Sequence, residues 1–169
     1  MGTNRRRYRA NIRQLILILV ALALMGLGVR YILNEYHESQ LVHLHFKSPD
    51  GRTTPRFGLE IARNASERTK GLMFRKELPE SGGMFFAFPK QEEHSFWMKN
   101  TYISLDLIFI NSELKVVGVL ADVPVLNEEQ RKVSAPSLYV VELAAGSAKK
   151  HGIVPGSLVV VEGQVPRGA

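Results

Sequence analysis

The sequence predicts a small α+β domain that is mostly β and barrel-like, preceded by one transmembrane helix. Two observations predict this class. An uncharged apolar run lies near the N-terminus, and the rest of the chain alternates between short β-branched or aromatic segments and turns rich in Gly, Pro and Asn. The length of 169 residues suits one domain with short accessory segments. The pattern excludes an all-α fold, and the chain has no internal repeat.

The positive charge of the chain is concentrated in its first residues. The formal net charge is +6, and residues 1–30 contain six arginines and no Asp or Glu. The remaining 16 basic residues (22 − 6) equal the 16 acidic residues, so the rest of the chain is formally neutral. This distribution argues against nucleic-acid binding, which needs a basic surface on the folded part. The absence of cysteine excludes disulfides, thiolate nucleophiles and thiolate-bound metal centres.

The apolar run from Gln14 to Leu33 is predicted to be a signal-anchor helix that crosses the cell membrane once. A helix of about 20 residues spans roughly 30 Å, which is the thickness of a bilayer core. Five arginines precede the run, which predicts a cytoplasmic N-terminus and places residues 35–169 in the periplasm or outside the cell. The alternative is a cleaved signal peptide and a secreted domain. The sequence therefore predicts a cytoplasmic basic segment at residues 1–13, the membrane helix at 14–33 and a linker at 34–40. The extracytoplasmic domain follows at 41–163, and a tail at 164–169.

Eight short strands are predicted in the domain. The first, Leu41–Lys47, alternates apolar residues with His43 and His45, as is typical of a half-buried strand. The others are bounded by turn residues such as those at positions 48–51 and 111–113. The eight segments are 41–47, 56–62, 84–88, 95–99, 105–110, 115–121, 138–143 and 157–161.

Two short helices are predicted between these strands. Asn64 should begin the first, because Glu67 follows three residues later and completes a capping box; this helix should run to about Met73. The second covers residues 144–151 and should end at Gly152. The polar loop 122–136 is long for a compact domain, which is typical of functional loops. The end of the chain, from residue 163, is predicted to be loose.

Several strings of residues are similar to one known family. They are Gly71-Leu72-Met73-Phe74-Arg75, Gly83-Met84-Phe85-Phe86-Ala87-Phe88, Phe96-Trp97-Met98-Lys99-Asn100-Thr101, Leu105-Asp106-Leu107-Ile108-Phe109, Val141-Glu142-Leu143-Ala144-Ala145-Gly146, and Gly152-Ile153 with Gly156. On these residues the chain resembles the uncharacterised proteins called domain of unknown function 192. Ser104 replaces the usual proline of that family, and Asn111-Ser112-Glu113 replaces an Asp-Gly turn. The resemblance implies a compact, strand-rich domain that is often exported or membrane-anchored, and it implies no catalytic residue or cofactor.

The first candidate site combines Trp97, Lys99, Asn100 and Asp106. A tryptophan offers a stacking face, and the three polar side chains could orient a ligand at the rim of a cleft. The alternative interpretation, which the sequence favours, is structural. Asp106 lies in an apolar strand, where a carboxylate needs partners, and it could accept hydrogen bonds from Thr101, Asn100 or backbone N–H groups.

Arg75 and Glu142 form a second candidate for ligand binding. Each lies beside an apolar segment, so the two could form a half-buried ion pair if the fold brings them together.

Metal binding has weaker support in the sequence. Three methionines and a histidine carry ligands that suit copper, although methionines more often fill an irregular core. They are Met73, Met84, Met98 and His94. His43 and His45 lie on one face of a predicted strand, where a solvated face is the simpler interpretation. No metal site and no cofactor is therefore predicted.

The sequence carries no recognisable catalytic motif. None of the serines lies in a Gly-x-Ser-x-Gly elbow, and no phosphate-binding glycine loop occurs. We therefore expect a non-enzymatic module of the cell envelope that binds a small ligand, a glycan or a partner protein. The alternatives are a hydrolase that uses Asp106 with Lys99 or His94, and a copper-binding protein. The sequence gives no signal for an oligomeric state.

Overall fold

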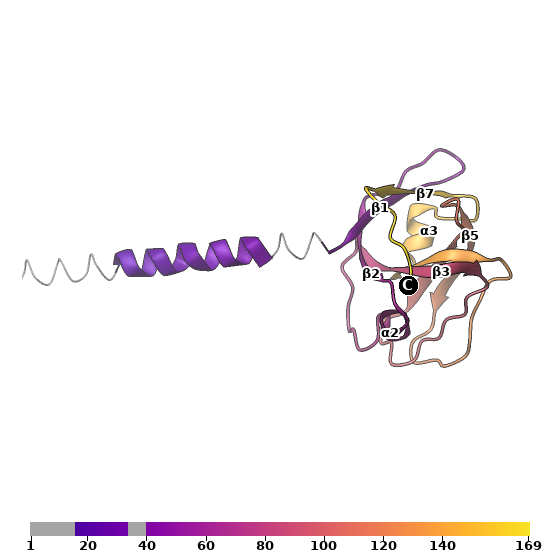
Figure 1. The fold of residues 1–169 in the computed structure, drawn as a ribbon, viewed down its shortest axis with the longest axis horizontal. Coiled ribbons are helices and arrows are strands. Elements are labelled where there is room, and N and C mark those ends of the chain that lie inside the picture. The colour runs from indigo at the N-terminus through magenta and orange to yellow at the C-terminus, as the bar shows by residue number, and fades with distance from the viewer. Residues whose placement is uncertain (1–15, 34–39) are drawn as a thin grey trace, which may run out of the picture. The chain divides into compact units, whose positions relative to one another are not determined.

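The computed structural model describes residues 16–33 and 40–169 (Figure 1). The chain divides into two compact units, one up to Gln40 and one from Leu41 to Ala169. The predicted cytoplasmic segment, the start of the predicted membrane helix and nearly all of the linker lie outside the described residues.

One helix, Ile16–Leu33, makes up most of the described part of the first unit. None of its 18 residues is buried. It is long and apolar enough to cross a membrane, and a signal sequence near the N-terminus meets the same criterion. The helix therefore agrees with either of the two predicted roles.

The second unit is one seven-stranded sheet with two short helices. Its elements are β1 (Val42–Lys47), β2 (Phe57–Ala62), α2 (Ala65–Lys70), β3 (Gly82–Glu92), β4 (Leu105–Ile110), β5 (Val116–Val123), β6 (Ser137–Ala144), α3 (Ser147–His151) and β7 (Leu158–Glu162). The strand order is β5-β4-β6-β3-β2-β1-β7. Only β2 and β3 run parallel, because α2 connects them, and all other neighbours are antiparallel.

The sheet curls until its two edge strands meet at one end. Lys115, just before β5, forms a β-bridge with Leu158 of β7. Next to this bridge, the Val116 N–H donates to the Ser157 carbonyl at 2.8 Å and the Val159 N–H donates to the Leu114 carbonyl at 2.8 Å. Figure 1 shows α3 inside the curve of the sheet and α2 outside it. The predicted mostly-β, barrel-like class is confirmed.

Both faces of the central strands are buried. Successive side chains point to opposite faces of a strand, and β3, β4 and β6 therefore contribute to two apolar clusters. Phe85 and Val141 lie in the inner cluster, which also contains Ala148 of α3. Phe86 and Val140 lie in the outer cluster together with Leu72, which follows α2. The outer face of the sheet is thus covered by the segment that follows α2 and by loops, and a site on this face can be enclosed.

Helix α2 begins where the sequence predicted and ends earlier than predicted. Asn64 accepts a hydrogen bond from the Glu67 N–H at 2.9 Å, and the Glu67 carboxylate accepts one from the Asn64 N–H at 3.2 Å, which confirms the capping box. The helix ends at Lys70, and Gly71 follows with a φ of 46°. Glycine adopts this left-handed region without strain, so the chain can turn here.

The predicted strand at residues 95–99 is not formed. Phe96 makes a single β-bridge with Arg131, with N–H to carbonyl distances of 2.8 Å in both directions. The Met98 N–H donates to the carbonyl of Asn127, which lies in a loop, at 2.7 Å. The aromatic content of the segment indicated a strand, but its side chains are used to cover the outer face of the sheet.

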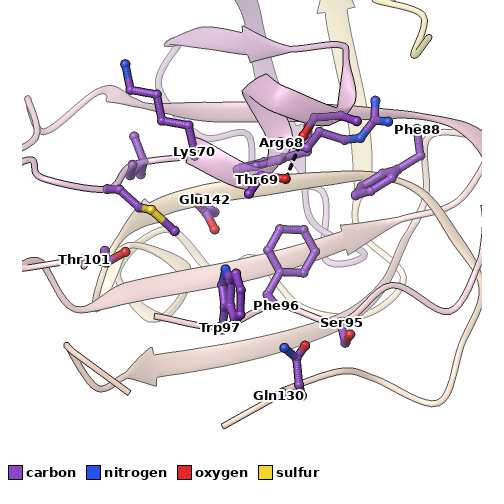
Figure 2. A pocket seen from close by; sticks show the side chains of 15 residues that line it. Arg68, Thr69, Lys70, Phe88, Ser95, Phe96, Trp97, Thr101, Gln130 and Glu142 are labelled. Atoms are coloured by element: carbon purple, nitrogen blue, oxygen red, sulfur yellow. Dashed lines mark hydrogen bonds between the residues drawn. The ribbon is translucent and has the colours of Figure 1, made fainter. Parts of the chain in front are cut away.

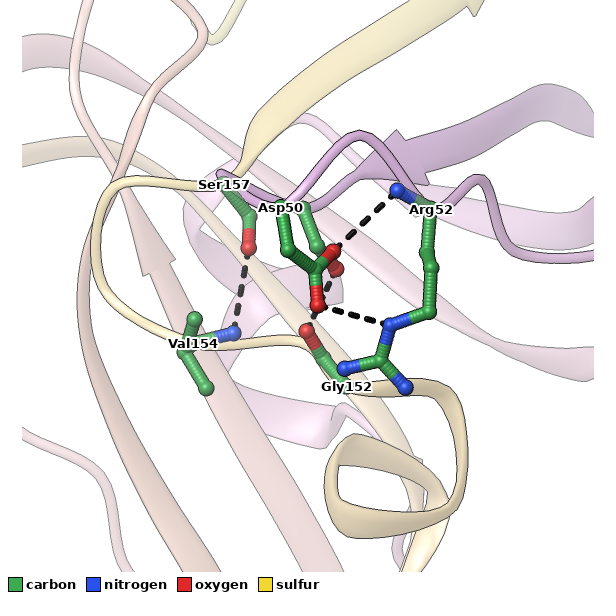
Figure 3. Close-up of polar contacts among 6 residues, drawn as sticks. Asp50, Arg52, Gly152, Val154 and Ser157 are labelled. Carbon is green, nitrogen blue, oxygen red and sulfur yellow. Dashed lines mark hydrogen bonds and ion pairs between the residues drawn. The ribbon is translucent and has the colours of Figure 1, made fainter.

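Two loops at the closed end of the barrel are tied together by side chains. Ser48 Oγ donates to the Gly152 carbonyl at 2.6 Å, and Ser157 Oγ accepts from the Val154 N–H at 3.1 Å (Figure 3). Asp50 and Arg52 form an exposed ion pair in the first of these loops. The Ser48 bond joins the β1–β2 loop to the segment before β7, and each of the other two contacts lies within one of these loops.

The last residues of the chain also differ from the prediction of a loose tail. The Ala169 N–H donates to the Arg63 carbonyl at 2.9 Å, and the Ala169 carbonyl accepts from Arg68 at 3.1 Å. Pro166 is buried, and Val165 packs against the inner cluster. The tail therefore lies against α2 and the sheet.

Candidate functional site

A pocket of about 350 Å³ lies on the outer face of the sheet. Its floor is formed by Phe86 of β3 and Glu142 of β6, and its walls come from α2 with the residues after it and from the segment 95–101. The lining residues are Ala65, Arg68, Thr69, Lys70, Gly71, Leu72, Met73, Phe86, Phe88, Ser95, Phe96, Trp97, Thr101, Gln130 and Glu142. This volume is at the lower end of the range that is usual for small-molecule sites.

Glu142 is the only acidic residue among those that line this pocket. It is 5% exposed, and within the described residues its carboxyl group makes no hydrogen bond or ion pair. Figure 2 shows its side chain in the middle of the pocket. An unpaired buried acid costs free energy, so a ligand that bonds to it recovers part of that cost.

The register of the sheet explains the burial of Glu142. Residues opposite each other in antiparallel strands point to the same face, and Glu142 lies opposite Met84 on β3 and Leu107 on β4. These apolar neighbours shield the carboxyl group from water. Burial raises the pKa of Glu142 to about 8, so the group is mostly protonated at neutral pH. A protonated carboxyl both donates and accepts a hydrogen bond.

Gly83 allows β3 to approach β6 at this point. A Cβ at this position would lie 2.2 Å from the Glu142 carbonyl oxygen, which no side chain can do.

Aromatic rings form much of the pocket wall. Phe96 contacts the rings of Phe86 and Phe88 edge to face, with centroid distances of 5.2 Å and 6.2 Å. Such contacts hold the rings in fixed orientations. Trp97 is 37% exposed, and Figure 2 shows the nitrogen of its indole on the edge of the ring that is turned toward Glu142. The wall thus offers flat apolar surfaces and one N–H donor.

Two basic residues of α2 lie at the pocket. The Arg68 guanidinium lies 5.2 Å from the centroid of the Phe88 ring and donates to the Ala87 carbonyl at 3.0 Å. Lys70 lies at the rim, and Figure 2 shows its side chain directed outward. Thr69 Oγ1 donates to the Ala65 carbonyl at 2.8 Å, so its oxygen can still accept a bond from a ligand. The pocket therefore offers two cationic side chains, which only donate, together with hydroxyl and amide groups that can also accept.

The four residues of the first predicted site are not brought together. Trp97 lines the pocket, whereas Lys99, Asn100 and Asp106 do not. Lys99 packs on the outside of the Trp97 ring, with its amine 5.3 Å from the ring centroid. Asn100 lies in a turn with a φ of 52°, and its carbonyl accepts from the Phe74 N–H at 2.8 Å.

Asp106 has a structural role. It is fully buried, and its two carboxylate oxygens accept from the Asp122 N–H and the Ala148 N–H, each at 2.8 Å. These bonds join β4 to the end of β5 and to the first turn of α3. The partners are backbone N–H groups, as the structural interpretation allowed, and the role is to fix the fold around the barrel end. Both oxygens are occupied, which disfavours Asp106 as the base of a hydrolase.

The predicted pair of Arg75 and Glu142 does not form. Arg75 instead bonds to both carboxylate oxygens of Glu60 on β2, each at 2.6 Å. The two side chains are 35% and 37% exposed, so this pair adds only modestly to stability. Arg75 is thus satisfied outside the pocket, and Glu142 is left without a cation.

The candidate metal ligands are divided between the core and the pocket. Met84 and Met98 are buried in the outer apolar cluster, and Met73 lines the pocket. His94 is stacked on Phe88 with a centroid distance of 3.5 Å, and burial lowers the pKa of this histidine. Within the described residues, no group of three or more His, Cys, Asp or Glu side chains could hold a metal ion.

The sequence and fold of the chain were compared with those of known proteins. The family model DUF192, described as an uncharacterised ACR, matches residues 47–161. The chain belongs to the DUF192 family. The predicted resemblance is confirmed, and it covers every strand from β2 to β6. No curated protein matches the chain.

Two solved structures share the DUF192 fold. A candidate transcription regulator from Sinorhizobium meliloti 1021 is 31% identical, with a TM-score of 0.69 over 72% of this chain and 93% of that chain. A protein of unknown function from Novosphingobium aromaticivorans DSM 12444 is 35% identical, with a TM-score of 0.67 over 71% of this chain and 84% of that chain. The Sinorhizobium chain consists almost wholly of the shared domain, so the domain folds as an independent unit in that protein.

The sequence identified some pocket residues and missed others. The sequence indicated Trp97 because a tryptophan offers a stacking face, and Glu142 because an acid lies beside an apolar segment. It did not indicate Arg68, Lys70 and Gln130, because exposed polar residues on a helix or in a loop carry no local signal. Only the packing of α2 and of the loop that contains Gln130 over β6 places them at the pocket.

Proposed function

We propose that this DUF192 protein is a membrane-anchored binding module that holds a small molecule in the pocket above β6, on the extracytoplasmic side. The observation that carries the proposal is Glu142, a buried acid without a partner that faces an aromatic pocket. A structural acid in a core would be paired, as Asp106 is. A carboxyl group left free at the floor of a cavity is the arrangement expected of a ligand-binding group.

The strings that relate the chain to its family support the pocket as the site. The segments 71–75, 83–88, 96–101 and 141–146 each contribute lining residues. The Sinorhizobium relative is named a candidate transcription regulator, so a regulatory role that involves nucleic-acid binding is the alternative to consider. The formal neutrality of residues 31–169 in this chain, with 16 basic and 16 acidic residues, does not favour it.

Binding can be tested by titrating residues 40–169 with benzoate, benzamide, benzylammonium and glucose at millimolar concentration. We expect at least one probe to shift the NMR signals of Thr69, Gly71 and the Trp97 indole N–H. Trp97→Ala should abolish the shifts of Thr69 and Gly71, because it removes the stacking face and the N–H donor.

Tyr102→Ala is the matched control, since Tyr102 is also an exposed aromatic residue, at 48%, and does not line the pocket. This variant should bind as the parent does. The proposal fails if none of the four probes shifts pocket signals, or if both variants lose binding equally.

The membrane topology has its own prediction. Alkaline phosphatase, which is active only after export, should be active when fused after Ala169. The same enzyme fused after Arg13, before the apolar helix, should be inactive. An inactive fusion after Ala169, together with an active β-galactosidase fusion at the same position, would place the domain in the cytoplasm and refute this part of the proposal.

A further inference from the structure

We infer that the ligand of this pocket is a small organic acid, with a carboxylate that meets Glu142 and a ring or apolar face that lies on Phe96 and Trp97. The inference rests on the proposed function, because it uses the same pocket. It adds the chemical class and the charge of the ligand.

The charges around the pocket favour an anion. Arg68, Lys70 and Glu142 are the only ionisable residues in the lining. The cross-strand neighbours of Glu142 are apolar, and the lining residues contributed by segment 95–101 and by Gln130 are uncharged. Because burial keeps Glu142 protonated at neutral pH, the pocket carries two positive charges and no negative one. A cationic ligand is therefore repelled, and an anion is attracted to the mouth.

The free hydrogen-bonding groups are complementary to a carboxylate. Within the described residues, the carboxyl group of Glu142 makes no hydrogen bond, so the O–H of its protonated form is available to a ligand. A bond from a neutral acid to a carboxylate is charge-assisted and is stronger than a bond to a neutral group. The Trp97 N–H lies on the edge of the ring turned toward Glu142, so it can donate to the second oxygen of the ligand (Figure 2).

The size and walls of the pocket limit the rest of the ligand. A volume of about 350 Å³ holds a single ring with short substituents. The rings of Phe96 and Trp97 provide flat surfaces on which a ring can stack. An inorganic anion would leave these surfaces unused.

The test compares three probes that share one ring and differ in charge, namely benzoate, benzamide and benzylammonium. Their dissociation constants for residues 40–169 are measured by NMR titration between pH 6 and pH 9. We expect benzoate to bind most tightly and benzylammonium least. The benzoate Kd should rise about tenfold between pH 7 and pH 9, because ionised Glu142 repels the probe and can no longer donate.

Glu142→Gln separates the role of this side chain from other effects of pH. Glutamine keeps an N–H donor at the same place and cannot ionise, so the variant should bind benzoate with a Kd that no longer changes with pH. Glu113→Gln, at an exposed position away from the pocket, should retain the pH dependence.

The outcomes distinguish this inference from the proposed function. If benzamide or benzylammonium binds more tightly than benzoate, or if benzoate binds better as pH rises, the pocket is a binding site for another class of ligand. If no probe, including glucose, shifts the pocket signals, both the inference and the proposed function fail.

Discussion

Asp106→Ala is expected to lower the free energy of unfolding by about 3–5 kcal/mol. The substitution removes a fully buried carboxylate that accepts from two backbone N–H groups, each at 2.8 Å. The Asp122 and Ala148 N–H groups would remain buried without acceptors, and each such loss costs about 1–3 kcal/mol. Asp106→Asn should have a smaller effect in the same direction, because the amide keeps one acceptor and turns an N–H toward the other donor.

Urea unfolding of residues 40–169 measures this effect directly, since the midpoint falls while the slope stays constant if only stability changes. Asp122→Asn is the matched control. It makes the same chemical change as Asp106→Asn and lies on the same hairpin, but the side chain of Asp122 is exposed and its N–H still bonds to Asp106. A loss of less than about 1 kcal/mol in Asp106→Ala would show that the two bonds contribute little net stability.

The same residue shows how far the sequence could predict the fold. A carboxylate within the apolar string Leu105–Ile110 needs partners, and the sequence predicted hydrogen bonds that included backbone N–H groups. It could not predict that one partner lies in the first turn of α3, 42 residues away. Long-range partners depend on the strand order, which the pattern of apolar residues does not specify. Strands with turns at both ends, by contrast, were predicted from local residues alone.

For the segment 95–99, the local sequence predicted a strand that the structure does not form. Its aromatic residues have a high preference for strands, and nothing local indicated that they cover a sheet instead of joining it. Because a strand was predicted here, the sequence did not predict that this segment forms a wall of the pocket. A strand would have turned Trp97 and Phe96 to opposite faces, whereas the irregular segment lets both line the same cavity.

The stability of the domain is expected to fall as the pH rises from about 4.5 to about 8, because of Glu142. The unfolded chain releases the proton of this side chain near its ordinary pKa of 4.5, whereas burial raises the pKa in the folded domain to about 8. Between these values the folded state binds one more proton than the unfolded state, so each pH unit costs about 1.4 kcal/mol. Over the interval of about 3.5 units (8 − 4.5), the loss is about 4–5 kcal/mol.

Other groups also titrate in this range, so the contribution of Glu142 is measured as a difference. The free energy of unfolding of Glu142→Gln minus that of the parent should increase from pH 4.5 to pH 8 and then stay constant. Glu113→Gln, where the glutamate is exposed, should give a difference that does not change with pH. A constant difference for Glu142→Gln as well would mean that the folded domain holds this side chain in a solvated or paired state.

An increase in this difference would also bear on function. If the difference is also positive at pH 7, a glutamine at position 142 makes the domain more stable than the acid does in the absence of a ligand. A protein that keeps a destabilising acid at the floor of a pocket is expected to use it, since stability and binding often conflict at functional sites. Saturating benzoate should therefore stabilise the parent at pH 7 and should lose this effect as the pH rises above about 8, where Glu142 ionises. If the parent loses stability as the pH rises but benzoate does not stabilise it, Glu142 destabilises the fold without binding an acid. The buried acid would then not be evidence for a ligand site.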